Sequence, residues 1–151
     1  MKGVTTMSLT DYSHLEEEIK NAPEQQILPA NTEAKLRIVK IDSGIIDDEA
    51  KKSYGAEWHS ITFDVPQEEL APMFNHFMWD LNSKDKIDPK QYQAALRDFR
   101  DFAEAFNIDY SRPIDWNELE GLEGWAVLKI VKDKTGEYPD KNGVKKFITP
   151  K

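Results

Sequence analysis

The chain has 151 residues, no cysteine, and 28 acidic against 20 basic side chains, which gives a net charge of −8. Its length predicts about one domain, and the absence of cysteine excludes disulfides, thiolate metal sites and a cysteine nucleophile. No apolar run approaches the roughly 18 residues of a membrane span, and the start lacks the apolar segment of a signal peptide, so we expect a cytoplasmic protein.

Residues 1–30 are predicted to form an N-terminal arm. Within it, residues 11–20 fit a short helix, with Leu15 and Ile19 at i, i+4 spacing. Residues 21–31 are polar and are interrupted by two prolines. This part of the arm is therefore expected to pack loosely against the rest of the protein.

Two β-strands are predicted next, over residues 35–46 and 57–65, because both segments are rich in β-branched and aliphatic or aromatic residues. The second strand alternates, which assigns four residues to its core face, namely His59, Ile61, Phe63 and Val65. Trp58 then lies on the outer face, which is unusual for so large a ring unless something covers it.

Residues 74–81 predict a third strand with aromatic side chains on both faces. Phe77 and Trp79 are expected in the core, and Phe74 and His76 are expected on the opposite face. A strand that is apolar on both sides is either buried twice or exposes a binding surface.

The clearest element is a helix that begins after the N-cap Asp88, has Pro89 in its first position and ends near Asn107. Its apolar residues recur at three- and four-residue steps and make one stripe: Tyr92, Ala95, Leu96, Phe99, Phe102, Ala103 and Phe106. Charged residues cover the opposite face, so the stripe is expected to pack on the core.

The chain is predicted to close with a β-hairpin, whose strands cover residues 125–132 and 144–149 around a turn at 133–142. In the first of these strands Trp125 is expected to point outward. The last strand is expected to turn Val144 and Ile148 inward and Lys145 and Phe147 outward.

The hairpin reverses the charge balance of the chain. From Trp125 onward there are seven lysines and three acidic residues, a net +4 in a chain of −8, so the remainder carries −12. Aromatic rings lie among these lysines. Cations interleaved with flat rings are typical of surfaces that bind single-stranded nucleic acid.

Three strands, one helix and two strands follow one another, which is the order of the oligonucleotide-binding (OB) fold, a five-stranded Greek-key β-barrel. We therefore predict a mainly β, barrel-shaped OB-fold domain over residues 31–151, with the helix plugging the open end of the barrel. A layered β-α-β-β sheet is the alternative, and it would require the strands near Glu57 and Phe74 to pair differently.

The sequence also resembles a family of small phage-encoded single-stranded DNA-binding proteins. The matching features are Leu28-Pro29, Gly55 before residues 58–65, the segment 119–124, and in the hairpin Glu137-Tyr138, Asn142, Val144 and Lys146-Phe147. The resemblance covers residues 28–149 and implies sequence-tolerant single-stranded DNA binding in phage replication or recombination, inside a bacterial host. Many such proteins end in an acidic tail that recruits other replication proteins, whereas this chain ends in Thr149-Pro150-Lys151.

The expected site spans the ligand face of the OB fold, which is formed by strands 2–3 and the loops after strands 1 and 4. The cations that would neutralise phosphates are Arg37, Lys51, Lys52, Lys129, Lys132, Lys134, Lys141 and Lys145. The rings that would stack on bases are Tyr54, Trp58, Phe74, Trp125, Tyr138 and Phe147. His76 would stack or meet a phosphate if it faces the groove. Such a site gives salt-sensitive, sequence-tolerant binding.

No catalytic residue, metal or cofactor is predicted. The spacing of His59 and His76 matches no metal signature, and the acidic run 47–49 fans its carboxylates outward instead of converging them as a nuclease would. An alternative function is a protein-interaction adaptor or a self-assembling module, since exposed aromatic residues on a barrel serve either role.

Overall fold

A computed structural model describes residues 9–149 and shows a mainly β protein built on one five-stranded antiparallel sheet. The strands are β1 (Glu33–Ile45), β2 (Glu57–Asp64), β3 (Phe74–Trp79), β4 (Glu123–Val131) and β5 (Lys141–Ile148), in the order β3-β2-β1-β4-β5. The five predicted strands are therefore confirmed. The layered alternative is wrong, because β2 and β3 pair directly with each other.

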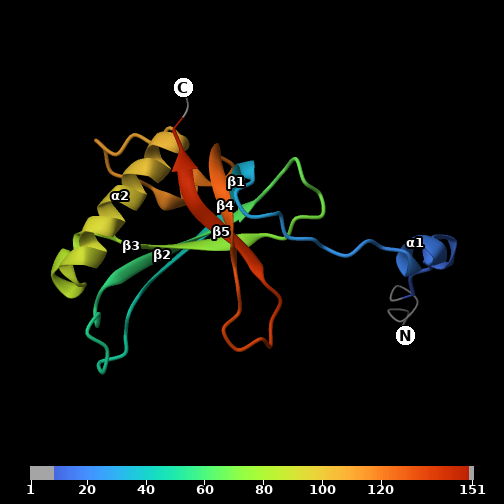
Figure 1. Cartoon of the computed structure of the whole chain (residues 1–151), viewed down its shortest axis with the longest axis horizontal. Coiled ribbons are helices and arrows are strands. Elements are labelled where there is room, and N and C mark those ends of the chain that lie inside the picture. The colour runs from blue at the N-terminus through green and yellow to red at the C-terminus, as the bar shows by residue number, and fades with distance from the viewer. Residues whose placement is uncertain (1–8, 150–151) are drawn as a thin grey trace, which may run out of the picture.

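The predicted helix is confirmed as α2 (Pro89–Ala105). Asp88 accepts a hydrogen bond from the Lys90 amide, and the Gln91 side chain accepts one from the Asp88 amide, which completes a capping box at the start of the helix. The apolar stripe buries Phe102 against Phe63 of β2. Figure 1 shows α2 lying across one side of the sheet, where it covers the core.

The sheet does not close into the barrel expected from the sequence. β3 and β5 are its two edges, and no backbone ladder joins them within residues 9–149. Side chains meet across this open seam instead: the rings of His76 and Phe147 lie 5.2 Å apart, edge to face. The seam leaves the edges of β3 and β5 available to line a surface groove.

Phe147 is buried, which corrects the prediction that it points outward. In the pairing of β5 with β4, Val144 lies opposite Leu128 and Lys146 lies opposite Val127, so Lys145 is an extra residue in a β-bulge. One extra residue reverses the facing of everything beyond it. The Phe147 ring therefore turns into the core, with 6% of the residue exposed, and Ile148 pairs with the outward-facing Trp125 instead of pointing inward.

The N-terminal arm crosses one end of the open seam and is hydrogen-bonded on both sides of it. Its short helical segment, predicted from the sequence, is present as a 3-10 turn, η2 (Ser13–Leu15), followed by α1 (Glu16–Lys20). Beyond it, the Gln26 amide donates to the Leu70 carbonyl just before β3. On the β5 side, Asn142 accepts from the Leu28 amide and donates to the Leu28 carbonyl. The arm thus bridges the two edges that the sheet leaves unpaired.

Replacing Asn142 by alanine should remove both bonds to Leu28 and the bond to the Lys129 carbonyl, and leave partly buried backbone groups unpaired. Asn142 is 4% exposed, so we expect the free energy of unfolding to fall by about 1–3 kcal/mol. Urea denaturation followed by circular dichroism measures this, and hydrogen exchange at the Leu28 amide reports the bridging arm itself. Asn82→Ala, at an exposed position, is the control; equal losses in both variants would refute the bridging role of the arm.

No helix among the described residues is long and apolar enough to cross a membrane.

Candidate functional site

Three aromatic side chains form a cluster on the outer face of β2 and β3, which we call the aromatic strip: Trp58, Phe77 and Trp79. Trp58 lies directly opposite Trp79 in the sheet. The ring centroids of Trp58 and Phe77 are 6.2 Å apart and nearly parallel, and those of Phe77 and Trp79 are 4.9 Å apart, edge to face. Phe77 is 51% exposed, so the strip presents aromatic surface to solvent.

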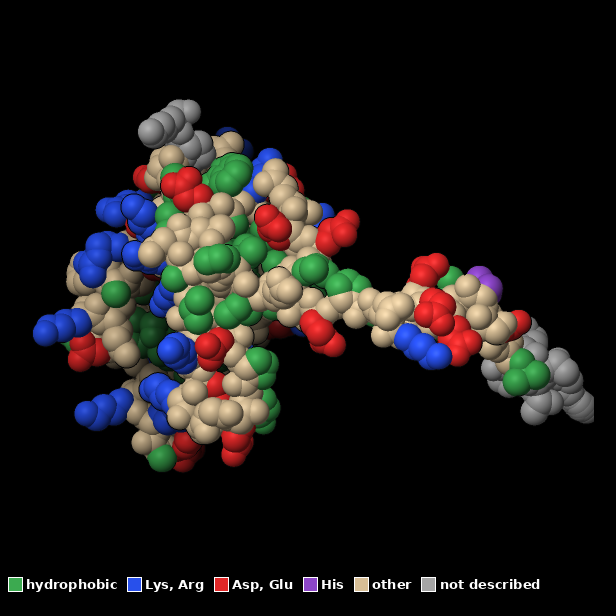
Figure 2. Space-filling model, turned by 45° about the vertical axis from the view of Figure 1, so that its right-hand side comes forward, with side chains coloured by type: hydrophobic (Ala, Val, Ile, Leu, Met, Phe, Trp, Pro, Cys, Tyr) green, Lys and Arg blue, Asp and Glu red, His purple; other side chains and the backbone are tan. Residues whose placement is uncertain are grey.

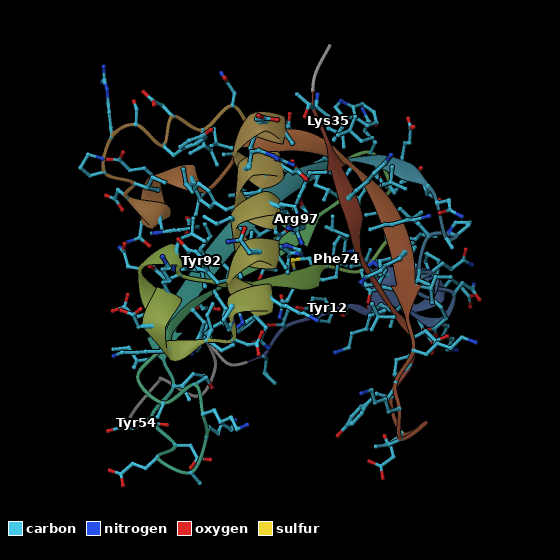
Figure 3. All side chains as sticks on the ribbon, turned by 60° about the vertical axis from the view of Figure 1, so that its left-hand side comes forward. Tyr12, Lys35, Tyr54, Phe74, Tyr92 and Arg97 are labelled. Carbon is cyan, nitrogen blue, oxygen red and sulfur yellow. The ribbon has the colours of Figure 1, made fainter. Side chains whose placement is uncertain are left out.

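The faces of β3 are opposite to those predicted. Phe77 and Trp79 were expected in the core but lie outside, whereas Phe74 is 4% exposed and belongs to the core. His76 also turns inward, where its Nε2 lies 2.8 Å from Oδ2 of Asp98 on α2. This partner allows a polar ring to occupy the inner face. Phe74, beside α2 in Figure 3, is therefore too buried for stacking.

Gly44 on β1 makes room for the first ring of the strip. It pairs with Trp58, and a Cβ atom added at Gly44 would lie 2.6 Å from Cζ2 of the indole, closer than atoms can approach. The indole therefore lies flat over the backbone of β1. Packing of this kind holds the ring in a fixed orientation on the surface.

A groove opens beside the strip along the seam between β3 and β5; we call it the β3–β5 groove. Its volume is about 710 Å³, and Phe77 belongs to both groove and strip. Lys129 and Lys141 line it from the β4–β5 hairpin, and Met73 and Val131 add exposed apolar surface. Figure 2 shows a hollow with an apolar floor and Lys and Arg side chains at its rim.

The other end of the strip meets a second group of cations. A depression beside Trp79 is lined by Lys51 and Lys52 of the β1–β2 loop (46–56) and by Lys86, with Asp85 and Asp88 also in its lining. The Lys86 ammonium donates to the Gly55 carbonyl at 3.4 Å, which holds it against this loop. Lys86, in the 3-10 segment η3 (Leu81–Lys86), was not predicted; its only sequence signal was its closeness to the third strand. The strip therefore has lysines at both ends.

The β1–β2 loop and the β4–β5 loop (132–140) extend from the same end of the sheet (Figures 1 and 3). Asp133 organises the second loop, since its carboxylate accepts from the Thr135 hydroxyl at 2.6 Å and from the Tyr138 amide at 3.0 Å. These bonds lower the pKa of Asp133, so this contribution to loop order is present above the ordinary carboxyl range and is lost at lower pH. Tyr138, 66% exposed, is carried on this ordered loop.

Several predicted residues are not brought into this arrangement. Trp125 lies opposite Lys35 of β1, whereas Trp58 of the strip lies opposite Gly44 of the same strand. These two positions on β1 are nine residues apart, which is about 30 Å of extended strand. Figure 3 shows Lys35 and Tyr54 at opposite ends of the molecule. Lys145 donates to the Asn31 side chain at 2.8 Å.

Arg37 is held by a partner on the neighbouring strand. Its guanidinium forms a two-point ion pair with Asp64, which raises the pKa of Arg37. Phosphate would have to compete with this carboxylate. Of the predicted cations, Lys51 and Lys52 share a depression with Trp79, and Lys129 and Lys141 share the groove with Phe77. Lys132 and Lys134 are exposed on the β4–β5 loop.

A partly buried set of hydrogen bonds, centred on the buried His59, anchors the end of β3. Ser43 Oγ lies 2.7 Å from His59 Nδ1, and His59 Nε2 lies 2.8 Å from Asp80 Oδ2. The Trp116 ring stacks on the imidazole at 3.9 Å. In the serine-hydrolase triad the histidine Nε2 faces the serine and Nδ1 faces the aspartate, so the two ring nitrogens of His59 have the opposite partners. Because Asp80 directly follows Trp79, these hydrogen bonds fix the end of the aromatic strip. The expected core-facing position of His59 is confirmed.

No family model, no curated protein and no solved structure matches the chain. The resemblance to phage-encoded single-stranded DNA-binding proteins therefore stays a prediction that depends on short motifs. No cluster of three or more metal-ligating side chains occurs in the part of the chain that the structure describes.

Proposed function

We propose that this protein is a non-catalytic module that binds single-stranded DNA with little sequence preference. The observation that carries the proposal is the aromatic strip with lysines at both ends. Bases that are paired in a duplex are already stacked, whereas bases of a single strand can stack on exposed rings. Lysines on either side would neutralise the phosphates that connect those bases.

The strand order and the position of the helix support an OB fold whose barrel stays open between β3 and β5. OB folds are partly open barrels that bind oligonucleotides on strands 2 and 3 and on the loops after strands 1 and 4. The aromatic strip lies on β2 and β3, and the lysines lie beside those two loops. A role in phage replication or recombination is the biological setting that we propose from the sequence.

The lysines of the β3–β5 groove provide a direct test. Fluorescence anisotropy of a labelled oligothymidylate should show binding that weakens as salt rises, with a slope of about −0.7 in log K against log salt for each phosphate neutralised. Lys129→Gln with Lys141→Gln should reduce the magnitude of the slope by roughly 1.4. The matched control is Lys20→Gln with Lys35→Gln, which removes the same charge from α1 and from the far end of β1 (Figures 1 and 3) and should change the slope little.

Two results would contradict the proposal. The first is no binding at low salt by the folded wild-type protein. The second is an equal change of slope in both variants, because binding would then depend on total charge and not on the groove.

A further inference from the structure

The described start of the arm, residues 9–20, carries apolar side chains into solvent, and we call it the arm segment. None of the residues of η2 and α1 is buried, and Leu9, Tyr12 and Ile19 are 85%, 60% and 57% exposed. Figure 1 shows α1 at the far end of the arm, away from the sheet. A helix this short is marginal in water without a packing partner, and exposed apolar clusters of this kind mark interaction surfaces.

The β3–β5 groove has the complementary composition. Met73, Phe77 and Val131 are 61%, 51% and 44% exposed, and Lys129 and Lys141 line the same groove. The arm segment combines exposed apolar residues with three consecutive acids, Glu16 to Glu18. Of these, Glu16 pairs with Lys20 at 2.9 Å in an exposed i, i+4 bridge, which is weak and easily exchanged. An acidic arm segment with exposed apolar side chains thus matches a groove lined by apolar residues and two lysines, with Asp140 as its one acidic lining residue.

We propose that the arm segment of one molecule docks in the β3–β5 groove of a second copy of the chain. The arm forms a wall of its own groove, since Gln25 and Ile27 line it. Its bonds to Leu70 and Asn142 hold it there. Beyond this anchor the chain leads α1 away from the molecule, toward a neighbour.

The contact joins two different surfaces, so each molecule keeps a free arm or a free groove and the assembly can extend head to tail. The inference concerns protein alone and does not depend on DNA binding. A protein that associates without binding DNA would refute only the proposed function, and one that binds DNA as a monomer at every concentration would refute only the docking.

Size-exclusion chromatography with light scattering tests the docking without DNA. The mass of the full-length protein should rise with concentration at low salt and fall when salt is added. Tyr12→Ser with Ile19→Ser should weaken association roughly 100-fold, because two apolar side chains lose their burial. Changing Glu16, Glu17 and Glu18 to Gln should weaken it roughly tenfold. Changing Glu68, Glu69 and Glu120 to Gln alters the same charge on the body and is the control.

A mixing experiment separates docking between molecules from docking within one. The Tyr12→Ser/Ile19→Ser variant keeps its groove, and a Lys129→Glu/Lys141→Glu variant keeps its arm. Each alone should be monomeric, and an equimolar mixture should form a dimer and nothing larger. A mass that does not depend on concentration in the wild type, or a mixture that stays monomeric while both variants keep the wild-type melting temperature, would overturn the inference.

Discussion

Replacing Phe147 by alanine is expected to lower the free energy of unfolding by about 3–5 kcal/mol, the usual cost of removing a buried phenylalanine. The Phe147 ring lies 5.5 Å from the ring of Phe102, 6.0 Å from that of Phe106 and 6.1 Å from that of Phe63. It therefore joins β5 to both β2 and α2. Since no backbone ladder joins β3 to β5 in the described part of the chain, side-chain packing carries much of the cohesion across the open seam.

Urea denaturation measures this loss, and Phe77→Ala is the matched control. The same residue type is removed from the outer face, where 51% of it is exposed, so a much smaller loss of stability is expected. Conditions in which the Phe147→Ala protein stays folded allow its DNA affinity to be compared with that of the wild type. An unchanged stability with a lost affinity would restore Phe147 as a stacking residue and would contradict its place in the core.

Local sequence signals predicted the elements of this fold well. The N-cap Asp88, the Pro89 that follows it and the apolar stripe determine α2 within the chain itself, because capping and periodicity are properties of neighbouring residues. The alternation of β2 likewise gave the correct facing of His59 and Phe63, both of which are buried. These elements need no information from distant parts of the chain.

The errors came from partners that are distant in sequence. The facing of β3 depends on Asp98, which lies on α2 and accepts the inward-turned His76; without that partner, the more aromatic face is the better candidate for the core. The facing of Phe147 depends on the bulge at Lys145, which arises from pairing with β4. A shift of one residue reverses a strand. Phe74 still borders the groove but is 4% exposed, Phe147 is in the core, and Phe77 and Trp79 take their place as surface rings.

The charge pattern predicted part of the site for a physical reason. Lys129 and Lys141 belong to the hairpin whose excess of lysines is visible in the sequence, and both line the β3–β5 groove. Lys86 reaches the site from a segment rich in both signs of charge, so composition could not single it out. An acidic protein can still offer a local basic surface, because the field at a groove depends on the nearest charges more than on the net charge.

Removing the aromatic strip should have the largest effect on the proposed binding. Replacing Phe77 by alanine is expected to raise the Kd for oligothymidylate about 5- to 150-fold, since each base stacked on an aromatic side chain is worth about 1–3 kcal/mol. Adding Trp58→Ala should weaken binding further, although less than additively, because the two rings stack on each other at 6.2 Å. Anisotropy titrations at one fixed salt concentration measure both effects.

Trp125→Ala is the control that makes this test specific. Trp125 is also an outer-face aromatic residue, 41% exposed, but it pairs with Lys35 at the far end of β1. Its removal should change the Kd little, whereas Phe77→Tyr should keep most of the affinity because the ring remains. If Trp125→Ala weakened binding as much as Phe77→Ala, the single strand would also contact the far end of β4, and the aromatic strip alone would not define the site.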